Sequence, residues 1–346
     1  MLRGPMDREL AGRLAKVPGF DEGILLTQAG RLDEGEAALR RAVAAASEIP
    51  DTRHALGVNL LTQGRYAEAW PLHEARVEMT WLSDAVPRTF PYPRWRGEDL
   101  AGKRVAVFPE QGWGDQIQFA RFLPALVATG AAVTLLASPP LARLFRHNFP
   151  DIDLIVASGA VDFPDPDYWL TLVDLPGRFG ATLETLPSQP YLRAPSRWSE
   201  APAGPKIGLM TKGNARFVHD YRRSLPPALA ERLANELPGK VFNLAPEISG
   251  ARDFADTAAI IDALDLVVSV DTAVGHLAGA MGKTCFLLIP GFATDWRWLR
   301  DRADSPWYSK HRLYRSDPEQ GWDAAVNRLL GDAAALIGTE QRLAGD

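Results

Sequence analysis

The stretch from Asp265 to Pro290 constrains the fold most strongly, because two short apolar runs flank a segment with helical spacing. The first run, Leu266 to Val270, is rich in β-branched residues and lies between two aspartates, as is typical of a buried parallel strand. Residues 274–281 place apolar and small side chains at helical spacing, and residues 284–289 form the second run. The stretch therefore predicts a β-α-β unit of an α/β protein.

The turn Asp271-Thr272-Ala273 joins the first predicted strand to the helix. Free backbone N–H groups and the helix dipole attract phosphate at such a junction, and open α/β sheets bind ligands at this edge. The Asp271 carboxylate also suits sugar hydroxyls. Alternatively, Asp271 or Thr272 only caps the helix. The residues alone leave both interpretations open.

A second strand-turn-helix pattern begins at Arg104–Phe108 and continues through a predicted helix ending at Val127. Gly112 and Gly114 permit a tight turn and a close approach of a ligand to the backbone. The third glycine position of a dinucleotide fingerprint falls at Ile117, which disfavours a redox enzyme. Asp115 lies at the helix start, where its simplest role is that of an N-cap.

An internal repeat precedes these strands. Gly30-Arg31-Leu32-Asp33-Glu34 returns as Gly64-Arg65-Tyr66-Ala67-Glu68, and Gly23 returns as Gly57, each 34 residues later. This is the tetratricopeptide period. Such repeats usually present a groove to a peptide, but about two units are fewer than the ~3 that a free-standing array needs. We favour packing against the following domain, with a small docking surface.

Several segments resemble the heptosyltransferase-type glycosyltransferases (glycosyltransferase family 9), in particular the bacterial branch that carries tetratricopeptide repeats. They are DTAVGHLAGAMGK at 271–283, EQGWGDQIQFARFLP at 110–124, RFGATLETLPSQPYL at 178–192 and PGFATDWRWLRDRADSPWYSKHRLYR at 290–315. The resemblance covers residues 93–315. It implies an α/β protein of the GT-B fold, with two Rossmann-like domains facing a cleft, preceded by a short all-α tetratricopeptide-repeat module.

The predicted organisation follows from the repeat, the resemblance and the proline-rich stretches. Its parts are 1–80, helical repeats; 81–102, a proline and aromatic linker; 103–193, an N-terminal Rossmann-like acceptor domain; 194–205, a hinge; 206–318, a C-terminal Rossmann-like nucleotide-sugar domain; and 319–346, a C-terminal helix.

The resemblance implies inverting, metal-independent transfer of a sugar from a nucleotide sugar to an acceptor hydroxyl, with the donor as a substrate and no cofactor. Asp115 becomes the candidate general base, which requires a desolvated carboxylate; otherwise it caps the helix or binds the acceptor. The candidate donor-binding residues are Lys212, Gly213, Asn214, Arg223, Ser224, Glu247, Asp271, Thr272, Ala273 and His276. The candidate acceptor or cleft residues are Gln111, Gly112, Gly114, Gln116, Trp296 and Arg297.

Each of these roles has an alternative in which the residue is purely structural or simply solvated. The loop around Lys212 is otherwise a solvated basic loop, and Met210-Thr211-Lys212 stands where the family often has a tryptophan before Gly-Asn. His276 is otherwise a core histidine, and Trp296 a packing residue. His219 is a further loop histidine that could act as a base, although loop histidines are more often bystanders.

Composition narrows the class of protein and its partners. A formal net charge of −5 without a basic run argues against nucleic acid, and no apolar run approaches the ~18 residues of a membrane span. The single cysteine, Cys285, permits no intramolecular disulfide, and a cytoplasmic enzyme is expected. The repeats favour a protein acceptor docked on them. The alternatives are a lipopolysaccharide or polysaccharide acceptor, and a non-catalytic scaffold with a degenerate GT-B domain.

Overall fold

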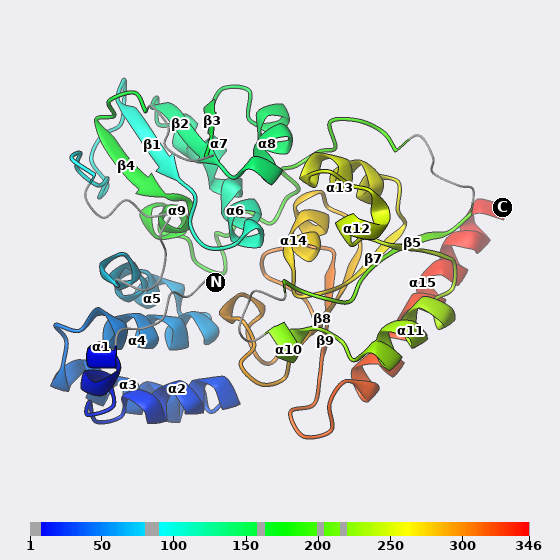
Figure 1. Cartoon of the computed structure of the whole chain (residues 1–346), viewed down its shortest axis with the longest axis horizontal. Helices are drawn as coiled ribbons and strands as arrows, with labels where there is room; N and C mark the ends of the chain where they lie inside the picture. Colours follow the sequence, from blue (N-terminus) through cyan, green and yellow to red (C-terminus); the bar gives the residue numbers. More distant parts are fainter. Residues whose placement is uncertain (1–7, 80–89, 158–162, 199–203, 215–219, 346) are drawn as a thin grey trace. The chain divides into compact units, whose positions relative to one another are not determined.

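A computed structural model describes residues 8–79, 90–157, 163–198, 204–214 and 220–345 of the 346-residue chain (Figure 1). It is a mixed α/β structure with two parallel sheets. By its internal contacts the chain divides into two units, which are treated separately below. The first unit contains Met1–Ala137, Asp151–Pro187 and Phe292–Arg302, and the second contains Ser138–Pro150, Ser188–Gly291 and Ala303–Asp346.

The sheet of the first unit has the strand order β3-β2-β1-β4, and all its pairs are parallel. Its strands are β1 (Arg104–Phe108), β2 (Ala132–Ala137), β3 (Asp153–Val156) and β4 (Tyr168–Thr171). The predicted strand at 104–108 is confirmed. Val107 pairs with Leu135 on one side and with Leu170 on the other, so an apolar strand lies at the centre of the sheet.

The helix predicted from β1 to Val127 is interrupted. It consists of α6 (Trp113–Phe119), the 3₁₀ helix η2 (Ala120–Phe122) and α7 (Leu123–Val127). Pro124 lies at the start of α7 and has no N–H to donate to the preceding turn, which breaks the helical ladder there. A single helix was therefore the wrong prediction for this stretch.

A helical module opens the first unit. It contains α1 (Arg8–Leu14), α2 (Phe20–Ala29), α3 (Leu32–Ala45), α4 (Pro50–Thr62), α5 (Tyr66–His73) and the 3₁₀ helix η1 (Glu74–Glu78). The repeated Gly30 and Gly64 both have a left-handed φ, of 84° and 79°, in the turns α2–α3 and α4–α5. A Cβ on Gly57 would lie 2.7 Å from the His73 backbone nitrogen, so this glycine lets α4 and α5 approach closely. The repeat corresponds to two helix pairs, and its assignment as a tetratricopeptide module stays a prediction.

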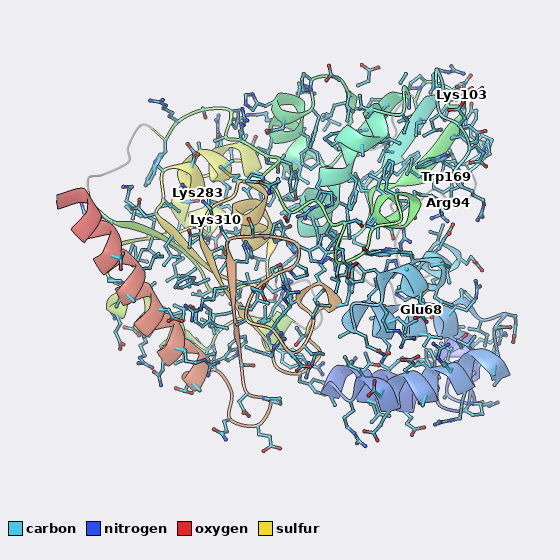
Figure 2. The ribbon with its side chains drawn as sticks, turned by 180° about the vertical axis from the view of Figure 1, so that it is seen from behind. Glu68, Arg94, Lys103, Trp169, Lys283 and Lys310 are labelled. Atoms are coloured by element: carbon cyan, nitrogen blue, oxygen red, sulfur yellow. The ribbon has the colours of Figure 1, made fainter. Side chains whose placement is uncertain are left out.

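Short helices and the proline-rich linker complete the first unit. The helices are η4 (Leu172–Asp174), α9 (Leu175–Arg178) and η5 (Trp296–Trp298). Residues 80–89 of the predicted linker lie outside the described residues. The described part pairs with β4: the N–H of Trp95 donates to the Trp169 carbonyl at 2.8 Å, and the guanidinium of Arg94 lies 5.9 Å from the centre of the Trp169 ring (Figure 2). Trp95 is buried.

The sheet of the second unit has the order β6-β5-β7-β8-β9, again entirely parallel. Its strands are β5 (Lys206–Met210), β6 (Lys240–Asn243), β7 (Leu266–Val270), β8 (Cys285–Ile289) and β9 (His311–Arg315). All residues of β7 and β8 are buried, which confirms the β-α-β unit predicted at 265–290.

The second unit also contains helices. They are η3 (Pro139–Leu141), α8 (Ala142–Asn148), α10 (Asp220–Arg223), α11 (Pro227–Glu236), α12 (Pro246–Ser249), α13 (Phe254–Asp262), α14 (Ala273–Ala280) and α15 (Asp323–Gly345). One apolar core joins β5, β7 and β8 to α11 and α15. Within the described ranges, no helix combines the length and the apolar character needed to cross a membrane.

The two units are interleaved in sequence. The boundary between Pro187 and Ser188 precedes the predicted hinge at 194–205, of which 199–203 lie outside the described residues. The segment 292–302, from the loop after β8, belongs by its contacts to the first unit. This assignment matters for the site, because the segment carries Trp296 and Arg297.

Candidate functional site

Parallel pairing brings two polar loops of the second unit to the same sheet edge. Met210, the last residue of β5, pairs with Ser269 of the neighbouring β7. The loop that begins at Thr211 and the turn at Asp271 therefore both leave the carboxyl edge of this sheet. Ligands of open α/β sheets bind at this edge.

Asp220 organises the basic loop. Its carboxylate accepts hydrogen bonds from Arg223 Nε at 2.7 Å and from Ser224 Oγ at 2.6 Å. Ser224 Oγ in turn accepts the N–H of Gly213 at 2.8 Å. A Cβ on Gly213 would lie only 2.0 Å from Asp220 Oδ1, so this position requires glycine. Gly213, Arg223 and Ser224 are thus held around a carboxylate that sequence reasoning did not single out.

Arg223 links this loop to the turn after β7. Its Nη1 donates to the Asp271 carbonyl at 3.1 Å, while its side chain is 23% exposed. The predicted donor-binding residues Gly213, Arg223, Ser224 and Asp271 are therefore brought together. A fixed and partly exposed guanidinium at the amino end of a helix is suited to bind an anion such as a diphosphate.

Thr272 occupies the N-cap position of α14, but its side chain makes no capping hydrogen bond. Its hydroxyl lies 3.2 Å from Ser269 Oγ instead. The capping alternative is therefore not what the Thr272 side chain does here. Ala273, which was predicted to lie in the turn, is the first helical residue, and its small side chain leaves the backbone at the helix start accessible.

His276 is buried and lies against the core while facing the turn. Its Nδ1 is hydrogen-bonded to the Tyr308 hydroxyl at 2.9 Å, and its Nε2 lies 3.9 Å from Asp271 Oδ1. Behind it, His311 Nε2 lies 3.1 Å from the Gly275 carbonyl. Sequence reasoning missed Tyr308 and His311, because isolated residues far along the chain give no local signal. The cluster fixes the orientation of α14.

The remaining predicted donor residues are at the surface of the second unit. Lys212 and Asn214 are exposed in the loop after β5. Glu247 is exposed on α12, which follows β6 at the next position of the sheet. His219 lies outside the described residues.

The first unit places Asp115 inside a buried ion-pair cluster. Gly112 is the N-cap of α6 and Asp115 is the third helical residue, so Asp115 is not the N-cap itself but caps the helix start through a capping box. Its Oδ2 accepts the Gly112 N–H at 2.8 Å, and its Oδ1 accepts a hydrogen bond from Arg297 Nη2. Gln111, just before, has a φ of 63°, which is rare for a residue with a side chain. The loop that carries Asp115 is therefore tightly specified.

Arg297 is 4% exposed, and each of its three guanidinium nitrogens donates a hydrogen bond. It donates twice to Asp295, at 3.0 Å each, and once to Gln118 Oε1. Its guanidinium lies 4.5 Å from the centre of the Trp296 ring and 5.1 Å from that of Phe119. Asp115 and Arg297 are 182 residues apart in sequence, yet both were candidate residues and the structure joins them. Gln118 and Asp295 were not anticipated.

Burial raises the pKa of Asp115, Arg297 lowers it, and Asp295 raises it again. The net result is a pKa above the ordinary value for aspartate, although the side chain keeps 18% exposure. Burial dominates because ionising a carboxylate away from water is costly. The desolvation that a general base requires is thus present at Asp115.

The other candidate acceptor residues differ in exposure. Trp296 is buried, and its ring packs edge-on against Tyr66 and Trp70, at 5.9 and 5.8 Å between centres. Gln116 is buried, whereas Gly112 and Gly114 are partly exposed in the turn. Trp113, which lies between these glycines and was not singled out, is 47% exposed. An exposed tryptophan two residues before Asp115 in the sequence offers an apolar face to an acceptor.

Part of the second unit is similar to a known protein family. Residues 223–286 match the family model of Glycosyltransferase family 9 (heptosyltransferase). Protein FlbA of Caulobacter vibrioides (strain ATCC 19089 / CIP 103742 / CB 15) is 29% identical over 381 aligned positions, which cover 93% of this chain and 63% of FlbA. The chain thus spans less than two thirds of that relative. The family match includes Arg223, Asp271 and His276.

Solved structures give weaker similarities. The iron-containing dodecameric glycosyltransferase TibC from enterotoxigenic E.coli H10407 aligns with a TM-score of 0.46 and 13% identity, covering 71% of this chain and 78% of TibC. The glycosyl transferase family 9 protein of Veillonella parvula DSM 2008 gives a TM-score of 0.46 and 13% identity, covering 70% and 99%. The functional argument therefore uses the geometry of the site and the family match of residues 223–286, and not these structural similarities.

Proposed function

We propose that the chain is a glycosyltransferase of the GT-B fold that moves a sugar from a nucleotide-sugar donor to an acceptor hydroxyl. The observation that carries the proposal is the Asp220–Arg223–Asp271 arrangement at the carboxyl edge of the second sheet. It lies almost entirely within the residues that match glycosyltransferase family 9. A cation held at a helix start is the arrangement that a nucleoside diphosphate requires.

The proposed reaction is a single displacement, which inverts the anomeric carbon. Asp115 takes the proton of the acceptor hydroxyl, and the acceptor oxygen forms a bond to the anomeric carbon. The bond from that carbon to the donor phosphate oxygen breaks, and the nucleoside diphosphate leaves with the bonding electrons. Arg223, Lys212 and the amino end of α14 stabilise its charge, and Asp271 holds sugar hydroxyls. Because protein cations supply this stabilisation, the proposed reaction needs no metal.

The direct test is a thermal-shift panel of nucleoside diphosphates and nucleotide sugars, with and without divalent metal ions. A ligand that binds only the folded protein raises its stability by about 2.7 kcal/mol at one hundred times its Kd. We expect one nucleotide to stabilise the protein without metal, which would identify the donor class. If no nucleotide raises the melting temperature, the donor proposal fails, and a non-catalytic scaffold becomes the better interpretation.

Replacing Arg223 by alanine should weaken nucleoside diphosphate binding about 10- to 100-fold, because a hydrogen bond to a charged group contributes about 1.5–3 kcal/mol. Titration calorimetry with the nucleotide from the panel measures the change. Arg222→Ala is the matched control: the same charge is lost one residue away, where the guanidinium lies 5.5 Å from the centre of the exposed Tyr221 ring. Equal losses in both variants would mean that only the net charge of the loop matters.

We further propose that the acceptor hydroxyl belongs to a protein. The helical module supports this, since paired helices of this period usually bind peptides. The test supplies the intact chain with a donor carrying a labelled sugar and compares a protein acceptor fraction with a polysaccharide fraction. We expect the label in material that protease degrades. Label that survives protease but not glycosidase would instead establish a polysaccharide acceptor.

A further inference from the structure

The helical module contacts the loop of Asp115 by two independent routes. We infer that α5 and η1 position Asp115 for catalysis, with Trp70 and Arg76 as the positioning residues. The inference deepens the proposed function and assumes its assignment of Asp115 as the base. It concerns contacts within the first unit alone.

The first route is the segment 292–302, which the module holds at separate points. The N–H of Ala293 donates to the Gln28 carbonyl at 2.9 Å, and Trp296 packs against Tyr66, Trp70 and His73 of α5. Trp70 is itself fixed, because its indole N–H donates to the Ala181 carbonyl at 2.7 Å. The ring of Trp296 therefore has a defined place.

Trp296 is connected to Asp115 through the next residue, Arg297. The Arg297 guanidinium lies over the Trp296 ring and donates to Asp115 Oδ1. Among the described residues that the structure places around the Asp115 carboxylate, the charged partners are Arg297 and Asp295. A shift of Trp296 would therefore move the cation that holds one oxygen of Asp115.

The second route is the ion pair between Arg76 and Glu110, at the start of the loop that carries Asp115. Arg76, in η1, donates from Nε and Nη2 to the two carboxylate oxygens of Glu110, at 2.9 Å each. Glu110 lies directly before Gln111, whose left-handed backbone starts the turn to Asp115. A bidentate pair between an arginine and a carboxylate fixes orientation as well as distance. Arg76 thus holds the start of the loop that Arg297 holds at its end.

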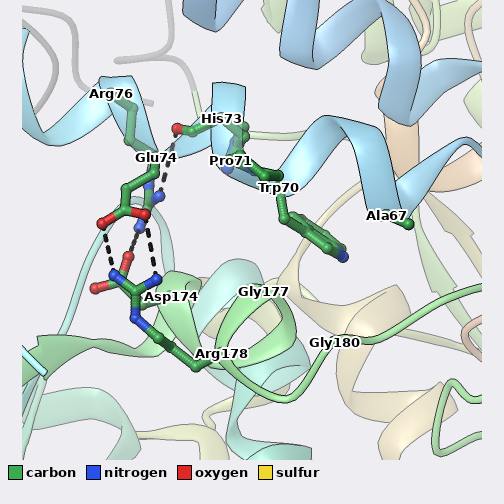
Figure 3. A pocket seen from close by; sticks show the side chains of 10 residues that line it. All are labelled: Ala67, Trp70, Pro71, His73, Glu74, Arg76, Asp174, Gly177, Arg178 and Gly180. Carbon is green, nitrogen blue, oxygen red and sulfur yellow. Dashed lines mark hydrogen bonds and ion pairs between the residues drawn. The ribbon is translucent and has the colours of Figure 1, made fainter. Parts of the chain in front are cut away.

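Figure 3 shows how closely α5 and η1 face α9 at this junction. Arg76 also donates to Asp174, and Glu74 accepts hydrogen bonds from Arg178 at 2.5 and 3.2 Å. The cavity of about 250 Å³ here is lined by these groups, which are already paired with one another. The junction is therefore built to hold the module in place rather than to receive a ligand.

The test compares Trp70→Phe and Arg76→Lys with the control Arg41→Ala, which removes an exposed ion pair with Glu22 elsewhere on the module. We expect both test variants to lower kcat about tenfold while changing donor KM less than twofold, since small misplacements of a reacting group are costly. Although Arg76→Lys keeps the positive charge, its kcat should stay below that of the wild type, because lysine cannot reproduce the bidentate contact. Arg41→Ala should match the wild type.

A second measurement needs no substrate. The Asp115 carboxyl is titrated by carbon NMR, with the Asp115→Asn spectrum identifying its signal. A variant that displaces Arg297 from the Asp115 carboxylate should raise the pKa of Asp115 further, because the charge of Arg297 lowers it. If both variants fold but leave kcat and this titration unchanged, the module is only a brace and the inference is overturned. If the wild type transfers no sugar, the proposed function fails, and the titration alone decides the inference.

Discussion

Asp115→Asn should lower the rate of sugar transfer about 10²- to 10⁴-fold, the usual contribution of a general base. Asparagine keeps the shape of the side chain and can still accept from the Gly112 N–H, so the loop should keep its conformation. Donor binding should be unchanged, because the residues assigned to the donor belong to the second unit. Steady-state kinetics with saturating donor, together with calorimetric donor binding, measure the two effects.

Asp295→Asn is the matched control for this prediction. It removes the other carboxylate that pairs with Arg297, but Asp295 has no assigned part in proton transfer. Transfer should fall less than about tenfold in this variant. A comparable loss in both variants would show that the rate depends on the carboxylates that pair with Arg297. Asp115 would then lose its assignment as the base.

The pH dependence of transfer should follow the same residue. The base must be ionised, so kcat/KM should fall as the pH drops through the pKa of Asp115. Because burial raises that pKa, the acid limb should lie above the pH at which an exposed aspartate titrates. The same burial implies that ionised Asp115 reduces the stability of the folded state, and this cost grows as the pH rises from the unfolded to the folded pKa. The melting temperature of Asp115→Asn, measured relative to that of the wild type, should therefore be higher at neutral than at acid pH.

The central strands were predictable from sequence because nearly all their residues are apolar. β1 and β7 begin and end at the predicted residues, since strands covered on both faces leave a nearly continuous hydrophobic run. The helix after β1 was not predictable in the same way. One proline within an apolar segment decided between a continuous and a broken helix, and the apolar pattern does not reveal that choice.

The site was predictable where its residues follow neighbouring strands of one sheet. Gly213, Arg223 and Asp271 follow adjacent parallel strands, so the topology alone brings them together. The Asp115–Arg297 pair was not predictable, because it depends on the segment after β8 joining the first unit. Nothing in the local pattern around Arg297 distinguishes it from an arginine of the second unit.

Arg76 lies at the centre of a buried charge network in the first unit. Its side chain is 2% exposed, as is that of Asp174, and Glu110 is 1% exposed. Thr171 donates to Glu110 at 2.6 Å, and Arg94 also pairs with Asp174. Burial raises the pKa of Asp174, but Arg76 and Arg94 lower it by more, so it stays well below its ordinary value. The network therefore keeps its charges in the folded protein.

Arg76→Met should destabilise the first unit by about 3–5 kcal/mol, because it leaves two buried carboxylates without their main cation. Urea unfolding followed by tryptophan fluorescence measures the change. Arg53→Met removes a more exposed pair with Glu78 and should cost less than about 1 kcal/mol. The difference between wild type and Arg76→Met should narrow at acid pH, because the stability from Asp174 is lost as the pH falls through its lowered folded pKa.

A double variant separates the charge effect from packing. In Arg76→Met with Asp174→Asn, one of the uncompensated charges is gone, so part of the lost stability should return. Hydrogen exchange then shows where the loss lies. If the helical module were an independent array, Arg76→Met would lower protection in α4 and α5 only. Because Arg76 bonds to residues that follow β1 and β4, we expect the amides of both strands to lose protection together with the helices. Protection lost in the helices alone would contradict this shared stability and would favour a separable peptide-binding module.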